Sequence, residues 1–137
     1  MTYQTITNEK LFELLQNKYF DGIDRADASA AVEAFHEDIN WAHTQVWVHD
    51  GHDQSAVDVL HGREQVRKFL SDRIGQMQAV GIKHKVHQVV TDGKSGAFRA
   101  EVVGPSGESK PFFGWVEISD GKISNYSIGP VLMGSDH

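Results

Sequence analysis

Apolar residues recur at helical spacing near the start of the chain. Leu11, Leu14 and Leu15 fall on one side of a helix. Thr7 stands where a capping side chain is preferred, and Glu9 follows it in what would be the first turn. The pattern therefore predicts an amphipathic helix that begins just after Thr7.

Two further helices are predicted within the first 80 residues of the chain. Asp27 can cap a short second helix that carries Val32 and Phe35 on one side. A third helix follows Gly62 and has a continuous apolar stripe. The stripe consists of Val66, Phe69, Leu70, Ile74 and Met77.

Alternation of apolar and polar residues marks the strands. The alternation over residues 39–48 predicts one strand between the second and third helices. A polar loop follows over residues 49–54. One face of this strand carries Ile39, Trp41, His43, Gln45 and Trp47.

Four more strands are predicted in quick succession after the third helix. They lie at about residues 82–91, 97–103, 110–119 and 122–130. Turn residues typical of hairpins separate them, at Asp92-Gly93, Pro105-Ser106-Gly107 and Asp120-Gly121. Helices followed by an antiparallel meander predict an α+β fold.

One polar residue interrupts the apolar face of the strand at residues 82–91. Because side chains alternate along a strand, His84 shares a face with Ile82, Val86 and Val90. An imidazole in an apolar layer is costly to bury unless a hydrogen bond satisfies it. His84 is therefore either a satisfied core histidine or a proton-transfer base.

Composition limits the classes of function. The 137 residues suit a single domain over residues 1–137, and the absence of cysteine excludes disulfides and thiolate metal sites. A net charge of −6 disfavours nucleic acid or an anionic membrane as the main partner. Since neither a signal peptide nor an apolar run of membrane-spanning length is evident, we expect a cytoplasmic protein.

We expect neither a metal nor an organic cofactor. The chain has no glycine-rich phosphate loop. His49-Asp50-Gly51-His52-Asp53 has the residue types of a metal site, but these residues crowd one loop instead of converging from several elements. A solvated loop is the favoured interpretation.

Several segments together resemble the SnoaL-like, or nuclear transport factor 2-like, superfamily. The segments are residues 19–27, 34–38, 61–66 and 120–123. The resemblance implies a cystatin-like cone, in which a curved and mainly antiparallel sheet wraps three N-terminal helices around a pocket. It is specific for the fold but not for the function, because the superfamily contains isomerases, dehydratases, hydrolases and proteins without activity.

Within the superfamily, Asp24 and His84 fall where scytalone dehydratase and hexachlorocyclohexane dehydrochlorinase place an aspartate and a histidine. Tyr19 falls at the oxyanion-hole tyrosine of ketosteroid isomerase, and His43 at the position of its base. Gly114 lies near the position of the second acid of that isomerase, so the resemblance implies an incomplete oxyanion hole. Tyr19 and His43 can polarise a substrate oxygen, or line the core and the wall.

The resemblance also implies a pocket for a small ligand. Its expected walls are Trp41, Phe69, Met77 and Phe112, although such residues are equally typical of a core.

Three functions remain open. The first is a cofactor-independent lyase or isomerase that acts on a small, mainly apolar oxygenated molecule, with His84 as base and Asp24 as its orienting carboxylate. The second is an epoxide-type hydrolase in which the same pair activates water. The third is a module that binds a small ligand or dimerises without catalysis.

A homodimer is expected because a half-open sheet must cover its outer face. Phe113, Trp115 and Val89 fall on the strand faces opposite the expected pocket.

Overall fold

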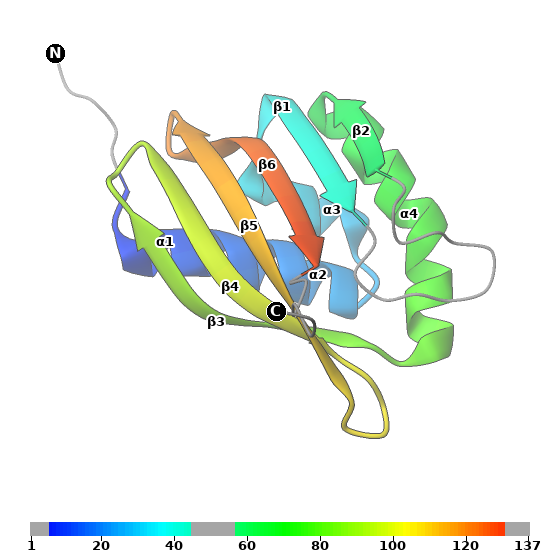
Figure 1. Cartoon of the computed structure of the whole chain (residues 1–137). Coiled ribbons are helices and arrows are strands. Elements are labelled where there is room, and N and C mark those ends of the chain that lie inside the picture. The colour runs from blue at the N-terminus through cyan, green and yellow to red at the C-terminus, as the bar shows by residue number, and fades with distance from the viewer. Residues whose placement is uncertain (1–5, 45–56, 131–137) are drawn as a thin grey trace, which may run out of the picture.

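A helical layer packs against one face of a curved sheet. The computed structural model describes residues 6–44 and 57–130 and is shown in Figure 1. The helical segments are α1 (Asn8–Phe12), the π-helical η1 (Glu13–Phe20), α2 (Asp21–Asp24), α3 (Ala28–Ala31), the short 3₁₀ segment η2 (Val32–Ala34) and α4 (Arg63–Val80). The strands are β1 (Phe35–Thr44), β2 (Val57–His61), β3 (Lys83–Thr91), β4 (Ser95–Val103), β5 (Ser109–Ser119) and β6 (Lys122–Pro130).

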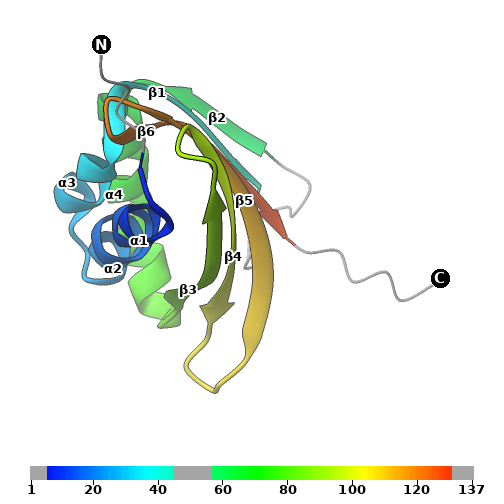
Figure 2. The same cartoon turned by 90° about the vertical axis from the view of Figure 1, so that its left-hand side faces the viewer.

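The sheet has the strand order β2-β1-β6-β5-β4-β3. Neighbouring strands are antiparallel except for the parallel pair of β1 and β6. Figure 2 shows the helices gathered on one side of a sheet that bends around them. The core lies between the two layers and includes Leu11, Leu15, Phe35 and Phe112, each fully buried. The predicted α+β fold with a curved, mainly antiparallel sheet is confirmed.

The helix starts agree with the predicted caps. Thr7 accepts a hydrogen bond from the backbone N–H of Lys10 at 3.1 Å, and Asp27 accepts one from Ala30 at 3.0 Å. Phe35 was expected on the second helix but is the first residue of β1, with an extended backbone. The apolar side chain alone could not distinguish these states, since it is buried in either case.

Strand β2 was not predicted. Its apolar and polar side chains lie on the opposite faces from those of the usual pattern. It pairs with β1, where Leu60 lies opposite Trp41. Val57 and Val59 are 55% and 74% exposed on the outer face, while Asp58 and Leu60 are partly buried. An aspartate therefore faces inward between two valines that face out.

The predicted hairpin at Asp120-Gly121 is confirmed. Both residues have positive φ angles, +55° and +74°. This is the backbone of a type I′ turn, which matches the right-handed twist of the two strands it joins.

A β-bulge in β3 changes which residues face the core. The register with β4 shifts between Val86 and Gln88, so one extra residue, His87, lies in β3. Val90, predicted to face inward, is 58% exposed, whereas Val89, predicted to face outward, packs against the core. Both predictions were wrong because an inserted residue exchanges the two faces of a strand beyond it.

Candidate functional site

His84 and Asp24 are in direct contact, as the sequence predicts. His84 lies near the start of β3 and Asp24 ends α2. The imidazole Nδ1 is 2.7 Å from Asp24 Oδ1, and the backbone N–H of His84 donates to Asp24 Oδ2 at 2.8 Å. Each side chain is only 11% exposed. A neutral His84 that donates from Nδ1 keeps the lone pair on Nε2, which is the form a base requires.

Gln16 and Phe20 hold this pair in place. The amide of Gln16 donates to the backbone carbonyl of His84 at 3.1 Å and accepts from the backbone N–H of Val86 at 2.6 Å. The ring of Phe20 stacks on the imidazole, with centroids 5.1 Å apart and planes 12° apart. The backbone and the ring of His84 are therefore both fixed by the first helical run.

His43 lies on β1 beside a second carboxylate. Its ring stacks on Trp41, with centroids 5.3 Å apart and planes 7° apart. Asp58 Oδ2 on β2 lies 3.7 Å from His43 Nδ1, and Arg73 Nη2 on α4 lies 4.0 Å from the same oxygen. The Arg73 guanidinium also lies 4.7 Å above the ring of Phe69. A second histidine, a carboxylate and a cation thus converge from three elements.

Burial lowers the pKa of His43 to about 4. The Asp58 carboxylate raises this pKa and offsets part of the effect of burial, while the charges of His84 and Arg73 lower it further. His43 is therefore neutral at neutral pH.

Tyr19 lies inside the core beneath Trp41. It is 2% exposed, and its hydroxyl accepts a hydrogen bond from Trp41 Nε1 at 3.1 Å. Burial raises the pKa of Tyr19 well above its usual value, which makes it a weak proton donor. The geometry favours a structural role for Tyr19 over the polarisation of substrate.

Tyr126 completes this buried aromatic cluster. Its ring centroid is 5.1 Å from that of Tyr19. Within residues 6–44 and 57–130, its hydroxyl has no partner at hydrogen-bond geometry. Burial, with the Tyr19 hydroxyl nearby, raises the pKa of Tyr126.

Of the residues expected to line the pocket, two lie near His43 and one lies on the His84 side. Trp41 and Phe69 lie together near His43, with ring centroids 5.3 Å apart. Phe112 is fully buried and contacts Phe20, the residue that stacks on His84, at 5.8 Å. The side chain of Met77 lies outside the described residues.

Gly114 has no room for the second acid of ketosteroid isomerase. A Cβ atom added there would lie 2.1 Å from the ring of Phe98 and 2.9 Å from Ile128. Phe98 therefore fills the space where that acid would stand.

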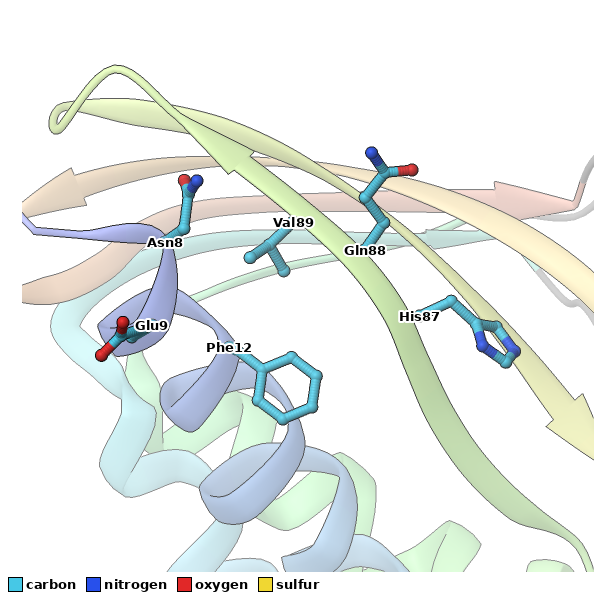
Figure 3. A pocket seen from close by; sticks show the side chains of 6 residues that line it. All are labelled: Asn8, Glu9, Phe12, His87, Gln88 and Val89. Carbon is cyan, nitrogen blue, oxygen red and sulfur yellow. The ribbon is translucent and has the colours of Figure 1, made fainter.

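A shallow groove on another part of the surface is separate from these residues (Figure 3). It lies between α1 and β3 and has a volume of about 430 Å³. The groove is lined by Asn8, Glu9, Phe12, His87, Gln88 and Val89. Since none of the candidate proton-transfer residues borders it, the groove does not bear on the proposed chemistry.

The loop that has the residue types of a metal site is not described by the structure. His49 and His52 lie outside the described residues. In the part of the chain that is described, no group of three or more histidine, aspartate or glutamate side chains could hold a metal ion. The same part contains no helix long and apolar enough to cross a membrane.

Sequence reasoning missed Gln16, Asp58 and Arg73. The alternation in residues 57–61 could have indicated β2, but it would have placed the valines inside and Asp58 outside. Gln16 and Arg73 are polar residues on predicted helices, where solvent exposure is the ordinary expectation. Only the packing of the helices on the sheet shows their contacts.

Comparison with known proteins identifies the family. The model of the SnoaL-like domain matches residues 17–126. No curated protein sequence matches the chain.

Solved structures share the fold at low sequence identity. A putative ketosteroid isomerase from Kribbella flavida has 18% identity and a TM-score of 0.63, covering 91% of this chain and 80% of that one. A cystatin-like protein of unknown function from Methylobium petroleophilum has 13% identity and a TM-score of 0.70, with coverages of 96% and 82%. An epoxide hydrolase of the LEH-like type from M. tuberculosis has 14% identity and a TM-score of 0.60, with coverages of 90% and 84%.

At these identities the likeness establishes the fold alone. The family model, in contrast, spans most of the chain, including both Asp24 and His84. This protein therefore belongs to the SnoaL-like domain family.

Proposed function

We propose that this protein is a cofactor-independent lyase or isomerase acting on a small, mainly apolar oxygenated molecule. One observation carries the proposal: the 2.7 Å contact between His84 Nδ1 and Asp24 Oδ1, made by two nearly buried side chains. An imidazole oriented by a carboxylate on one nitrogen is a competent general base on the other.

His84 Nε2 takes a proton from a carbon of the substrate, and the imidazolium that forms is stabilised by Asp24. If a leaving group departs from the neighbouring carbon, the electron pair of the broken C–H bond forms the double bond, and the reaction is an elimination. If the proton returns to a different carbon, the reaction is an isomerisation. Neither step requires an electron acceptor.

A sequence resemblance and a structural neighbour support a proton-transfer enzyme without distinguishing its reaction. Scytalone dehydratase and hexachlorocyclohexane dehydrochlorinase, which the sequence resembles at Asp24 and His84, suggest elimination. The Kribbella flavida neighbour is named a putative ketosteroid isomerase. The blocked space at Gly114 argues against the ketosteroid oxyanion hole in this chain.

The second candidate is hydrolysis of an epoxide, with the His84–Asp24 pair activating water. The LEH-like neighbour from M. tuberculosis supports it. The same panel of compounds tests both candidates.

The experiment uses small cyclic hydroxyketones, enones and epoxides incubated with the full chain in deuterated or ¹⁸O-labelled water. We expect deuterium incorporation or loss of water from a member of the first two classes. We also expect His84→Gln to lower the rate by about 10²–10⁴-fold, the usual contribution of a positioned base. His87→Gln, an exposed histidine of the same strand, is the matched control and leaves the rate unchanged.

Other outcomes assign other functions. Incorporation of ¹⁸O into a diol product shows a hydrolase. Binding without turnover, equal in the wild type and His84→Gln, would leave only a ligand-binding module and overturn the proposal.

We also propose that the protein forms a homodimer through the outer face of the sheet. One cross-strand row on this face includes Val59, Trp115 and Val90, which are 74%, 49% and 58% exposed. A second copy would bury this row and the neighbouring Phe113. The bulge in β3 replaces Val89, expected in this contact, with Val90.

Light scattering at micromolar concentration tests the dimer. We expect the mass of two chains for the wild type and for Glu33→Gln on the helical side, and a reduced mass for Trp115→Glu. A monomeric wild type would exclude the dimer.

A further inference from the structure

His43 has an unusual environment that the proposed base chemistry does not use. Its Nδ1 atom is buried, and within the described ranges it has no hydrogen-bond partner. The Asp58 carboxylate lies 3.7 Å away from this atom. Asp58 faces inward from β2, between two valines that face outward.

The carboxylate determines which nitrogen of a neutral His43 carries the proton. A proton on Nδ1 points its positive end toward Asp58. With the proton on Nε2, the lone pair of Nδ1 would face a negative charge, which is repulsive in a site of low dielectric. Arg73 Nη2 lies 4.0 Å from Asp58 Oδ2, the same oxygen that is 3.7 Å from His43 Nδ1.

Part of the His43 side chain is exposed. The side chain is 21% exposed although its Nδ1 atom is buried, so the exposed surface belongs to the rest of the side chain. Trp41 covers one of the two ring faces by stacking. Nε2 is the remaining polar atom of this side chain.

His43 and His84 are connected through a continuous set of aromatic contacts. His43 stacks on Trp41, whose indole N–H bonds to Tyr19. Tyr19 contacts Phe20 at 4.8 Å, and Phe20 stacks on His84. This set of contacts runs through the core, since Trp41, Tyr19 and Phe20 are each 2% exposed.

We propose that His43 Nε2 is a hydrogen-bond acceptor that selects a substrate bearing a hydroxyl group, with Asp58 and Arg73 as positioning residues. The donor of such a hydrogen bond is an alcohol or phenol O–H, whereas a substrate with only ketone or ether oxygens cannot supply one. This reverses one of the two roles considered from the sequence, in which His43 polarises a substrate oxygen instead of lining the wall. The inference rests on the proposed function only in taking the bound molecule as the substrate.

Burial supports the neutral form that this role requires, since it holds the pKa of His43 near 4. A neutral imidazole has one donor and one acceptor nitrogen, whereas a protonated imidazole has no acceptor.

The first test determines the tautomer by ¹⁵N NMR of histidine-labelled full-length protein at neutral pH. We expect His43 to carry its proton on Nδ1 in the wild type, and the Nε2–H form to grow in Asp58→Ala. Asp24→Ala is the matched control, and it changes the signals of His84 while leaving the tautomer of His43 unchanged. A wild-type His43 protonated on Nε2 would overturn the inference.

The second test measures binding with phenol and anisole, which differ in the hydrogen-bond donor. We expect phenol to shift the Nε2 signal of His43 and to bind about 3–10-fold more tightly than anisole, as one net hydrogen bond allows. The preference should fall below about 2-fold in Asp58→Ala, where the acceptor tautomer is no longer favoured. Equal affinities in the wild type, or no shift of His43 with millimolar phenol, contradict the proposal.

His84→Gln separates this inference from the proposed function. We expect this variant to keep the preference for phenol while losing turnover. A preference for phenol without any turnover in the wild type would support the subsite and reject the enzyme. Turnover that depends on His84 without a preference for phenol would support the enzyme and reject the subsite.

Discussion

The two histidine–carboxylate pairs differ in how tightly the carboxylate is held. Asp24 makes two hydrogen bonds to a single residue, one to the ring of His84 and one to its backbone. Asp58 makes neither to His43, lies 3.7 Å from the ring, and is shared with Arg73. The first arrangement fixes the orientation of the His84 ring, and the second adjusts the electrostatic environment of His43.

The origin of the difference is the element that supplies each carboxylate. Asp24 comes from the end of a helical run that packs directly on β3, where Gln16 also bonds to the strand. Asp58 comes from β2, the strand beside β1, so its side chain runs alongside that of His43 and does not meet it head on. A carboxylate that approaches end-on can orient a base, whereas one that lies alongside acts mainly through its charge.

The largest expected difference between the pairs is in catalysis. With the substrate found in the screen, Asp24→Asn should lower kcat by about 10²–10⁴-fold, because the orienting carboxylate is lost. Asp58→Asn should mainly raise KM, with kcat within about 3-fold of the wild type, because it affects binding and not proton abstraction. Steady-state kinetics measure both values. Equal losses of kcat would remove the distinction between the two pairs.

Stability should separate the pairs in the same direction. Asp24→Ala leaves the nearly buried His84 N–H and ring without their carboxylate, so we expect a loss of about 2–4 kcal/mol in the free energy of unfolding. Among the described residues, Asp58 makes no side-chain hydrogen bond that Asp58→Ala would remove, and we expect a loss of about 0–1 kcal/mol. Urea unfolding followed by tryptophan fluorescence gives both values. A larger loss for Asp58→Ala would show that Asp58 stabilises the fold more than its 3.7 Å separation from His43 implies.

Acid sensitivity should depend on His43. Its pKa is about 4 in the folded protein, against an ordinary value of 6.5 for histidine. Between these values the unfolded chain binds more protons, so stability is full above pH 6.5 and is lost as the pH falls toward 4. The size of the loss from this group is about 1–3 kcal/mol.

The measurement is the melting temperature of the wild type and His43→Gln over this pH range. We expect the wild type to lose more on acidification than the variant, which has no titrating group at residue 43. Identical pH profiles would show that His43 titrates normally.

The smallest effect concerns Arg73. Its charge lowers the pKa of His43, so Arg73→Met should raise that pKa by a fraction of a unit. The same change removes the cation above Phe69 and should reduce stability by about 0.5–1 kcal/mol. NMR titration and urea unfolding measure the two effects. A fall in the His43 pKa would mean that Arg73 acts mainly by keeping Asp58 near the ring.

The sequence predicts most of the fold and the tight pair, but not the loose one. Alternation and turn residues locate β3 to β6, and the placement of Asp24 near His84 follows from the family resemblance. The bulge at His87 breaks the period of β3, and β2 keeps its period but has the valines outside and Asp58 inside, so a periodic pattern predicts neither. The contacts of Arg73 and Gln16 depend on how helices dock on the sheet, which no local rule specifies.

The second hydrogen bond of Asp24 has a consequence for how this protein can evolve. Strand β3 is an edge of the sheet, and an uncovered edge invites pairing with other chains and aggregation. By accepting the backbone N–H of His84, Asp24 shields this edge whether or not the histidine reacts. We therefore expect relatives that lack the proposed reaction to have lost His84 more often than Asp24, because the aspartate also serves the fold.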